Sequence, residues 1–456
     1  MKNNNSLVAK ISKVTSIDYH IGVTLLLRLW TIGAGGILII LIPLYLTAAE
    51  QGYFFTFASL IAMQVFFELG FNYVVVQLIG HEMACVSING NGELEGNSKS
   101  VSRIYSLISL LKKWYAIISL IFFAVVFFAG LYFFKNNGTL AVHDWLPGWM
   151  LLVFFSSINL FISPFLAVLE GMGFIGQVAT IRLIQSIVGY TLLSILFICK
   201  VGLLAIPSVT GVAAIFSIAL ILKKYGRLLF KTKVHDQVFT EKISWYKEIF
   251  PFQWKIALSW LSGYFIFQLF NPMLFAHQGA IEAGRIGLTL ATFSAMLSLS
   301  MSWVTAKSPI MARLIAGNKK EELNKLFISL MKKSGVLNLF ISLLFLLFVF
   351  SLKTLHINIV DRIAGLDVLA LLFLISIANH AIFSMAIYMR CHKEEPMIWN
   401  SLVTGILALP FIYFFSKISS FATIASYGVI MVFVSLPWCY ILFRQYYKRG
   451  SVNIKL

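Results

Sequence analysis

The chain has 456 residues, of which 59% are hydrophobic and only 12% charged. Charged residues make up about a quarter of an ordinary water-soluble domain, so this composition excludes that class and predicts a polytopic membrane protein. The formal net charge of +18 would suggest nucleic-acid binding in a soluble protein, but in a membrane protein it indicates basic loops on one face. The four cysteines lack metal-ligand or disulfide-framework spacing. We therefore expect no metal, no cofactor and no nucleic-acid partner.

The first apolar run, residues 21–46, is long enough to cross a bilayer and contains one charge, Arg28. At a rise of about 1.5 Å per residue, Arg28 lies about 10 Å below one membrane surface. One interpretation is that the side chain reaches the headgroups on its long stem. The other is that it faces a wet cavity and binds an anion, because charges inside the membrane are commonly functional.

Hydropathy predicts eleven further spans after the first, and each is near the length needed to cross the bilayer. The predicted spans are residues 21–46, 52–80, 114–134, 145–169, 174–199, 201–222, 250–275, 286–306, 335–352, 366–389, 397–416 and 421–443. We thus expect an all-α integral membrane protein with twelve transmembrane helices.

The distribution of positive charge predicts the orientation. Most of the 36 Lys and Arg residues lie in the N-terminal segment, the C-terminal segment and every second loop, whereas six lie in the opposite loops. Cytoplasmic loops of membrane proteins carry this excess. Both termini are therefore expected in the cytoplasm, a result that requires an even number of spans.

The long basic loop 223–249 divides the chain near its middle, with six predicted spans on each side. Such a division is typical of duplicated transporters with two parallel halves. We predict an N-terminal lobe at residues 1–222, a cytoplasmic basic linker at 223–249 and a C-terminal lobe at 250–456. Each half begins with a cation and a proline in its first span and a glycine opening the next, Gly52 or Gly284.

Polar residues inside the spans recur at helical spacing and therefore share helix faces. These stripes are Gln64, Glu68 and Asn72; Arg182, Gln185 and Gly189; Ser294, Ser298 and Ser302; and Ser376, His380 and Ser384. Polar side chains can join helices across dry interfaces. We expect this for the serine stripe at 294–302. We expect a cavity beside the stripes that contain Glu68 and Arg182, because keeping a charge dry is costly.

Two short runs then suggest a family. Residues 50–57, Glu-Gln-Gly-Tyr-Phe-Phe-Thr-Phe, with Phe-Glu-Leu-Gly at 67–70, resemble the second-span region of bacterial Wzx-type O-antigen and polysaccharide flippases. Residues 251–260, Pro-Phe-Gln-Trp-Lys-Ile-Ala-Leu-Ser-Trp, resemble the entry to the seventh span of the same proteins. These flippases belong to the multidrug/oligosaccharidyl-lipid/polysaccharide exporter superfamily.

The resemblance implies two six-helix lobes around a central cavity that carries undecaprenyl-pyrophosphate-linked oligosaccharide across a bacterial inner membrane. It implies a cation-rich site, which Arg28, Arg182 and Lys255 would form. An arginine suits this role because its planar fork binds two phosphate oxygens at once. The partners would be the lipid-linked oligosaccharide, membrane lipids and other polysaccharide assembly proteins.

Glu68 is the candidate for ion coupling, since a pyrophosphate that competes for Arg28 would release the carboxylate and change its affinity for a proton. A static ion pair between Glu68 and Arg28 is the alternative. Further cavity-lining candidates are Gln64, Asn72, Gln185 and His380.

Two other functions remain open. A multidrug or organic-cation antiporter of the same superfamily would share the fold but should carry more carboxylates than cations in its cavity. A membrane glycan polymerase or glycosyltransferase would need catalytic groups, and the sequence shows neither a nucleophile–base pair nor a phosphate-binding glycine loop. We therefore expect a transporter and not an enzyme.

Overall fold

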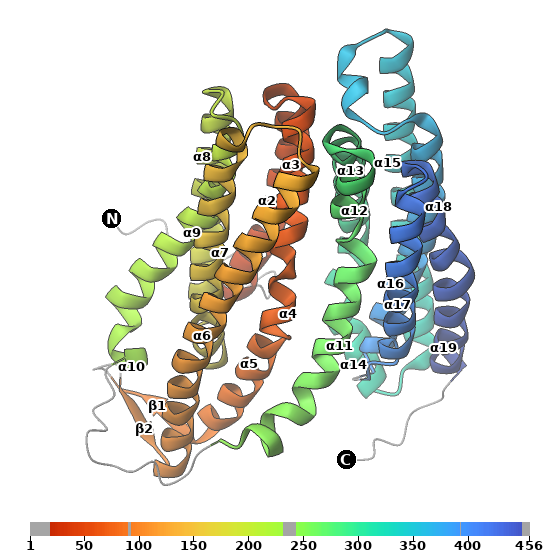
Figure 1. The fold of residues 1–456 in the computed structure, drawn as a ribbon. Coiled ribbons are helices and arrows are strands. Elements are labelled where there is room, and N and C mark those ends of the chain that lie inside the picture. Colours follow the sequence, from red (N-terminus) through yellow and green to blue (C-terminus); the bar gives the residue numbers. More distant parts are fainter. Residues whose placement is uncertain (1–18, 90–92, 231–242, 393, 449–456) are drawn as a thin grey trace, which may run out of the picture. The chain divides into compact units, whose positions relative to one another are not determined.

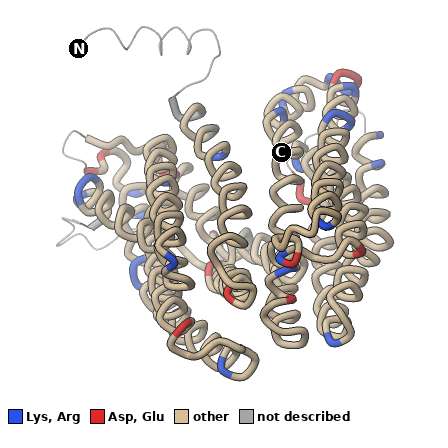
Figure 2. The backbone as a smooth tube through the Cα atoms, turned by 90° about the horizontal axis from the view of Figure 1, so that it is seen from above, with Lys and Arg blue, Asp and Glu red and all other residues tan. Residues whose placement is uncertain are grey.

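The computed structural model describes residues 19–89, 93–230, 243–392 and 394–448, and its described part is helical apart from one small hairpin (Figure 1). This follows from the composition, because a backbone that crosses a bilayer must satisfy its hydrogen bonds within itself. Most of each helix carries neither an acidic nor a basic residue (Figure 2).

The helices contain the predicted apolar segments and are joined by further short helices and turns. They are α2 (Tyr19–Tyr45), α3 (Ala48–Ile61), α4 (Val65–Glu68), α5 (Phe71–Glu82), α6 (Ser98–Asn137), α7 (Val142–Gly171), α8 (Ile175–Ile198), α9 (Pro207–Leu220), α10 (Gly226–Phe230), α11 (Phe250–Phe267), α12 (Phe270–Gln278), α13 (Ala280–Ala306), α14 (Ser308–Ala316), α15 (Lys320–Thr354), α16 (Leu366–Arg390), α17 (Ile398–Ser416), α18 (Ser420–Val429) and α19 (Leu436–Lys448). Short 3-10 or π turns are η1 (Ala62–Gln64), η2 (Met83–Cys85), η3 (Gly202–Ala205), η4 (Ile221–Tyr225), η5 (Trp245–Ile249), η6 (Asn358–Arg362) and η7 (Ile430–Ser435). The antiparallel hairpin pairs β1 (Val86–Ile88) with β2 (Leu94–Gly96).

Among the described residues, ten helices are long and apolar enough to span a membrane, and eleven if one bent pair counts as a single span. Each of the twelve predicted segments lies in a helix or in consecutive helices. The seventh corresponds to α11 and α12, which are separate helices with a break at residues 268–269. The prediction of an all-α, multi-pass membrane protein is thus confirmed.

The second span is broken near its middle. α3 begins at a capping box in which the Thr47 side chain accepts from the amide of Glu50, and the Glu50 side chain accepts from the amide of Thr47. Leu69 and Gly70 then both adopt left-handed backbone conformations, with φ of 48° and 68°, and the chain bends by 44° between the two parts of the span. Glu68 is the last residue of α4 before this break.

The described chain forms two compact units. Unit 1 contains the described residues of Met1–Ala34, Met63–Tyr132 and Ala141–Ala257, and unit 2 contains those of Gly35–Ala62, Phe133–Leu140 and Leu258–Leu456. The lobe boundaries at 222 and 250 remain a prediction.

Unit 1 is built around α7, which packs against α5, α8 and α9. Two glycines permit these contacts. A Cβ atom on Gly148 would lie 2.7 Å from the carbonyl oxygen of Leu203, and one on Gly171 would lie 2.7 Å from the Cβ of Ile79. Small residues at such contacts let helix backbones approach closely in a membrane.

In unit 1, a cluster of three charged residues joins α5, α6 and η5. The Arg103 side chain on α6 pairs with Glu82 of α5 at 2.6 Å and also with Glu248 of η5. Trp245, three residues before Glu248, packs its ring against Phe71 with centroids 5.1 Å apart. The described part of the basic connection, residues 243–249, is therefore fixed to unit 1.

In unit 2, α3 packs along α13 through facing glycines. A Cβ atom on Gly52 would lie 1.9 Å from the carbonyl oxygen of Ala280, and one on Gly284 would lie 2.8 Å from the amide nitrogen of Gly52. The adjacent Gln51 side chain is buried and donates to the carbonyls of Gly284 and Arg362, each at 2.9 Å. The two glycines at corresponding positions of the sequence halves thus touch each other.

Candidate functional site

The break in the second span of unit 1 carries a hydrogen-bonded acidic cluster. The Asn72 side chain donates to Glu68 Oε1 at 2.6 Å, and Gln64 is hydrogen-bonded to the same carboxylate. Tyr115 Oη of α6 in turn donates to Asn72 Oδ1 at 3.4 Å. The predicted stripe of Gln64, Glu68 and Asn72 is therefore a connected group. The left-handed turn at Leu69 and Gly70 interrupts its helix without separating its members.

Arg182 on α8 lies near this cluster and has a partner that the sequence analysis missed. Its Nη1 atom is 2.9 Å from Glu170 Oε1 at the end of α7. Arg182 also attracts Glu68 electrostatically, and this is the cation that acts on Glu68 in the structure. The signal in the sequence was a carboxylate twelve residues earlier, at the far side of the short turn between two spans.

Arg28 lies on a helix that contacts the helix of Arg182. The indole nitrogen of Trp30 on α2 donates to the Ser186 hydroxyl on α8 at 2.9 Å. α2 and α8 run in the same direction because three spans separate them. Arg28 precedes Trp30 by two residues and Arg182 precedes Ser186 by four, so both arginines lie within about 6 Å of this contact along the helix axes, toward the start of each helix. Arg28 is turned by about 200° around α2 from Trp30, so this contact does not itself bring its side chain to α8. Both side chains are exposed.

The other predicted residues lie elsewhere. Gln185 is buried and donates to the carbonyl of Ala213 at 3.1 Å and to the Ser217 hydroxyl at 2.7 Å, so it joins α8 to α9. His380 is buried and is 2.8 Å from the Ser334 hydroxyl, joining α15 to α16. Lys255 belongs to α11, but its side chain lies outside the described part of the structure.

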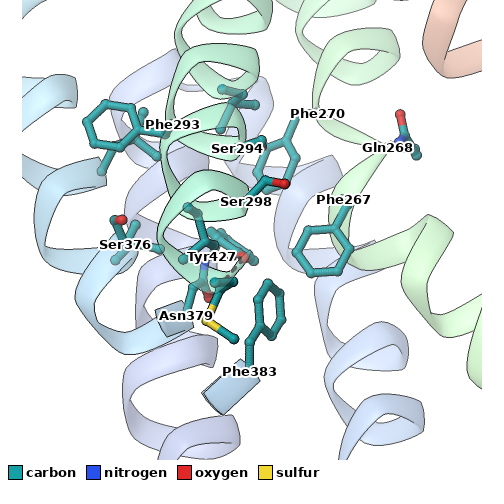
Figure 3. A pocket seen from close by; sticks show the side chains of 15 residues that line it. Phe267, Gln268, Phe270, Phe293, Ser294, Ser298, Ser376, Asn379, Phe383 and Tyr427 are labelled. Atoms are coloured by element: carbon teal, nitrogen blue, oxygen red, sulfur yellow. Dashed lines mark hydrogen bonds between the residues drawn. The ribbon is translucent and has the colours of Figure 1, made fainter. Parts of the chain in front are cut away.

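Unit 2 contains a cavity of about 440 Å³ that is lined by helices α11, α12, α13, α16 and α18 (Figure 3). Its lining residues are Phe267, Gln268, Phe270, Leu290, Phe293, Ser294, Leu297, Ser298, Met301, Leu372, Ile375, Ser376, Asn379, Phe383 and Tyr427. None of these residues is acidic or basic. The volume falls in the range of small-molecule sites.

The expected dry serine interface on α13 is wrong for two of its three members. Ser294 and Ser298 line the cavity, whereas the Ser302 hydroxyl donates to the Leu299 carbonyl of its own helix at 2.6 Å. The spacing correctly predicted that Ser294 and Ser298 share one helix face, but it could not predict whether that face packs against another helix or borders a cavity.

The two regions differ in the chemistry they can perform. Unit 1 presents the Arg182 guanidinium beside two carboxylates, Glu170 and Glu68, an arrangement that can bind an anion and exchange ion-pair partners. Unit 2 presents a neutral cavity with aromatic rings, hydroxyls and two amides, Gln268 and Asn379. Among the described residues, no group of three or more His, Cys, Asp or Glu side chains is placed to hold a metal ion.

No known family profile matches the sequence, and no curated protein matches it either. Solved structures do match the fold. The multidrug transporter DinF-BH of the MATE type aligns with a TM-score of 0.61 at 14% identity, covering 96% of this chain and 97% of its own. An inward-facing multidrug resistance MATE transporter of the MOP superfamily gives 0.59 at 13%, covering 95% and 99%.

A third similar structure is a MOP superfamily transporter from Pyrococcus furiosus, which aligns with a TM-score of 0.57 at 13% identity over 94% of this chain and 96% of its own. That protein is described as having a binding pocket of reversed polarity, which suggests a different function for it. At these identities the likeness concerns the fold. The chain has the fold of the MATE transporters of the MOP superfamily, over nearly its whole length.

Proposed function

We propose that this protein is a flippase. It carries an oligosaccharide linked to undecaprenyl pyrophosphate from the cytoplasmic to the periplasmic leaflet of a bacterial inner membrane, by alternating access and with both termini in the cytoplasm. The MATE-type fold supports a transporter, and the runs at 50–57 and 251–260 resemble Wzx flippases.

The observation that carries the proposal is the pair of exposed arginines, Arg28 and Arg182, on contacting helices of unit 1. A guanidinium in a membrane span is costly unless it meets water or an anion. A pyrophosphate offers several oxygens in the geometry that arginine binds with two parallel hydrogen bonds. In this proposal Glu170 occupies Arg182 in the absence of substrate, and the pyrophosphate takes its place.

This competition predicts opposite effects of removing the arginines and of removing the carboxylate. Binding of undecaprenyl pyrophosphate to the purified protein should weaken in Arg28→Ala and Arg182→Ala, whereas Glu170→Gln should strengthen it by freeing Arg182. Transport of the lipid-linked oligosaccharide in proteoliposomes should fall in the two arginine variants. Lys135→Ala, which removes an exposed cation at the end of α6, is the matched control and should leave both measurements unchanged. Full transport by Arg28→Ala and Arg182→Ala would reject the proposal.

A second candidate is export of hydrophobic organic compounds, which the neutral aromatic cavity of unit 2 favours. Two of the similar structures are multidrug transporters by name. The same proteoliposomes distinguish the two functions. A drug exporter should move a hydrophobic cation such as tetraphenylphosphonium, and its transport should not depend on Arg28.

A further inference from the structure

The cavity of unit 2 has two hydroxyls that face an open space rather than their own helix. Five hydroxyl side chains of α13 donate to backbone carbonyls three or four residues earlier, namely Thr289, Thr292, Ser300, Ser302 and Thr305. Ser294 and Ser298 have no such bond in the described structure, and both are exposed where they line the cavity. They are one helical turn apart, so about 6 Å separates their positions along the axis.

Aromatic rings surround these hydroxyls. Phe267 of α11 and Phe383 of α16 meet edge to face, with ring centroids 6.2 Å apart. Phe270 and Tyr427 form a second pair, with centroids 5.2 Å apart. Figure 3 shows Phe267, Phe270 and Phe383 on the same side as the Ser298 hydroxyl. The cavity thus offers apolar ring surfaces next to hydroxyl groups.

An amide–phenol pair adds polar groups held in place. Asn379 Nδ2 donates to Tyr427 Oη at 3.2 Å, a contact marked in Figure 3. The hydroxyl of the neighbouring Ser376 accepts a hydrogen bond from Asn338 Nδ2 of α15 at 3.0 Å. The Tyr427 hydroxyl also lies 3.4 Å from Asn379 Oδ1, as a donor to it. An amide side chain has two N–H donors and two acceptor lone pairs, so one N–H and one lone pair of Asn379 are left for a ligand.

Four classes of ligand can be compared with this lining. A phosphate would require a positive charge, and no basic side chain lines the cavity. An organic cation can pack on the aromatic rings, but it would leave the Ser294 and Ser298 hydroxyls without a hydrogen-bond partner. An isoprenoid chain would leave the Ser294 and Ser298 hydroxyls without hydrogen-bond partners, which is unfavourable. A sugar ring has hydroxyl edges that hydrogen-bond and C–H faces that pack on aromatic rings. Its surface complements both features.

We propose that this cavity is a glycan subsite that binds a neutral sugar unit of the transported lipid-linked oligosaccharide. The proposal rests on the flippase function above and concerns the sugar and unit 2 alone. Ser294, Ser298 and Asn379 supply hydrogen bonds, and Phe267 and Phe383 supply ring surfaces.

The test is protection of a cysteine placed in the cavity. The four native cysteines, two of which are exposed, are replaced by serine, and Ser298→Cys is introduced. The rate of its modification by a small maleimide is then measured with the complete lipid-linked oligosaccharide, with undecaprenyl pyrophosphate alone and with tetraphenylphosphonium. The matched control is Ser302→Cys, one turn further along α13 and outside the cavity.

The complete substrate should slow modification of Ser298→Cys severalfold and leave Ser302→Cys unaffected. Undecaprenyl pyrophosphate without sugar should not protect. In the otherwise native protein, Ser298→Ala should weaken binding of the complete substrate about fivefold, as expected for one neutral hydrogen bond, without changing the affinity for undecaprenyl pyrophosphate.

Equal protection by the sugar-free lipid would show that the cavity holds the lipid and would overturn the proposal. Protection by tetraphenylphosphonium alone would identify a drug site and overturn it as well. If the wild-type protein transports the oligosaccharide but no ligand protects Ser298→Cys, the subsite is wrong while the flippase function stands. If the wild-type protein does not bind or transport the oligosaccharide, the proposed function itself fails.

Discussion

The contact between α3 and α13 provides a sharp test of the packing in unit 2. A Cβ atom added to Gly52 would lie 1.9 Å from the Ala280 carbonyl oxygen and 2.6 Å from its carbonyl carbon. Both are backbone atoms, so no side chain can rotate away. Bringing the shorter contact to 3.0 Å requires the two helices to separate locally by about 1.1 Å.

The cost has two sources. Overpacking of a close contact costs about 1–3 kcal/mol. The separation also stretches the buried hydrogen bonds of Gln51, both 2.9 Å long, and leaving such a group unpaired costs about 1–3 kcal/mol. In the opposite direction, the higher helix propensity of alanine stabilises the folded protein by about 1 kcal/mol relative to glycine. Gly52→Ala should therefore destabilise the protein by about 3 kcal/mol.

The assay is thermal unfolding of the purified protein in one detergent, followed by tryptophan fluorescence. Gly263→Ala is the control, because no atom lies within 4 Å of a Cβ at that position, and it should unfold at the same or a higher temperature than the wild type. Gly52→Ala should unfold several degrees lower. If Gly52→Ala is as stable as Gly263→Ala, the described contact between α3 and α13 is incorrect.

Three further predictions concern topology, pH and coupling. A reporter that is active only in the periplasm should be silent when fused after Leu456 and active when inserted near Gly279; activity at the C-terminus would contradict the twelve-span topology. Partial burial raises the pKa of Glu248, but hydrogen bonds from Arg103 and a backbone amide outweigh this and lower it below its ordinary value of 4.5. The stabilisation by the ionised Glu248 is therefore present above pH 4.5 and is lost as the pH falls through the lowered pKa. Glu248→Gln should reduce the unfolding temperature at pH 7 and make the unfolding temperature fall less steeply in acid. If the unfolding temperature falls as steeply as in the wild type, this ion cluster does not cause the acid sensitivity. Glu68→Gln should abolish the dependence of transport on a proton gradient while binding of the lipid-linked oligosaccharide persists; retained gradient dependence would assign Glu68 a structural role.

Much of the fold was predictable because the bilayer imposes one dominant requirement. A run of about 20 apolar residues requires a helix, so each predicted segment lies in a helix or in consecutive helices. The helix ends are less constrained, because α6 and α15 begin at Ser98 and Lys320, well before the predicted spans at 114 and 335. The helix break at Leu69 and Gly70 was harder to predict from the sequence. Gly70 suits a left-handed turn, but Leu69 with φ of 48° does not follow from its residue type.

Side-chain partners were harder to predict than helices, because periodicity relates residues on one helix and partners belong to different ones. From the sequence, Arg28 was a candidate partner of Glu68, whereas in the structure Arg182 acts on Glu68 electrostatically and is itself paired with Glu170. The close approach of Gly52 and Gly284 likewise joins residues more than 200 positions apart.

Residues of two polar stripes with equal periodicity, His380 in one and Ser294 and Ser298 in the other, have different surroundings. His380 meets Ser334 on the neighbouring helix at hydrogen-bond distance, so its polar group is satisfied by protein and leaves no space. Ser294 and Ser298 face the rings of Phe267 and Phe383, which cannot accept a conventional hydrogen bond from them and which pack on each other instead. The polar groups that lack a protein partner are the ones left for a ligand. In a membrane span, a candidate binding site is therefore indicated by polar side chains that face apolar side chains on the neighbouring helix. This feature can be recognised only when it is known which helices pack together.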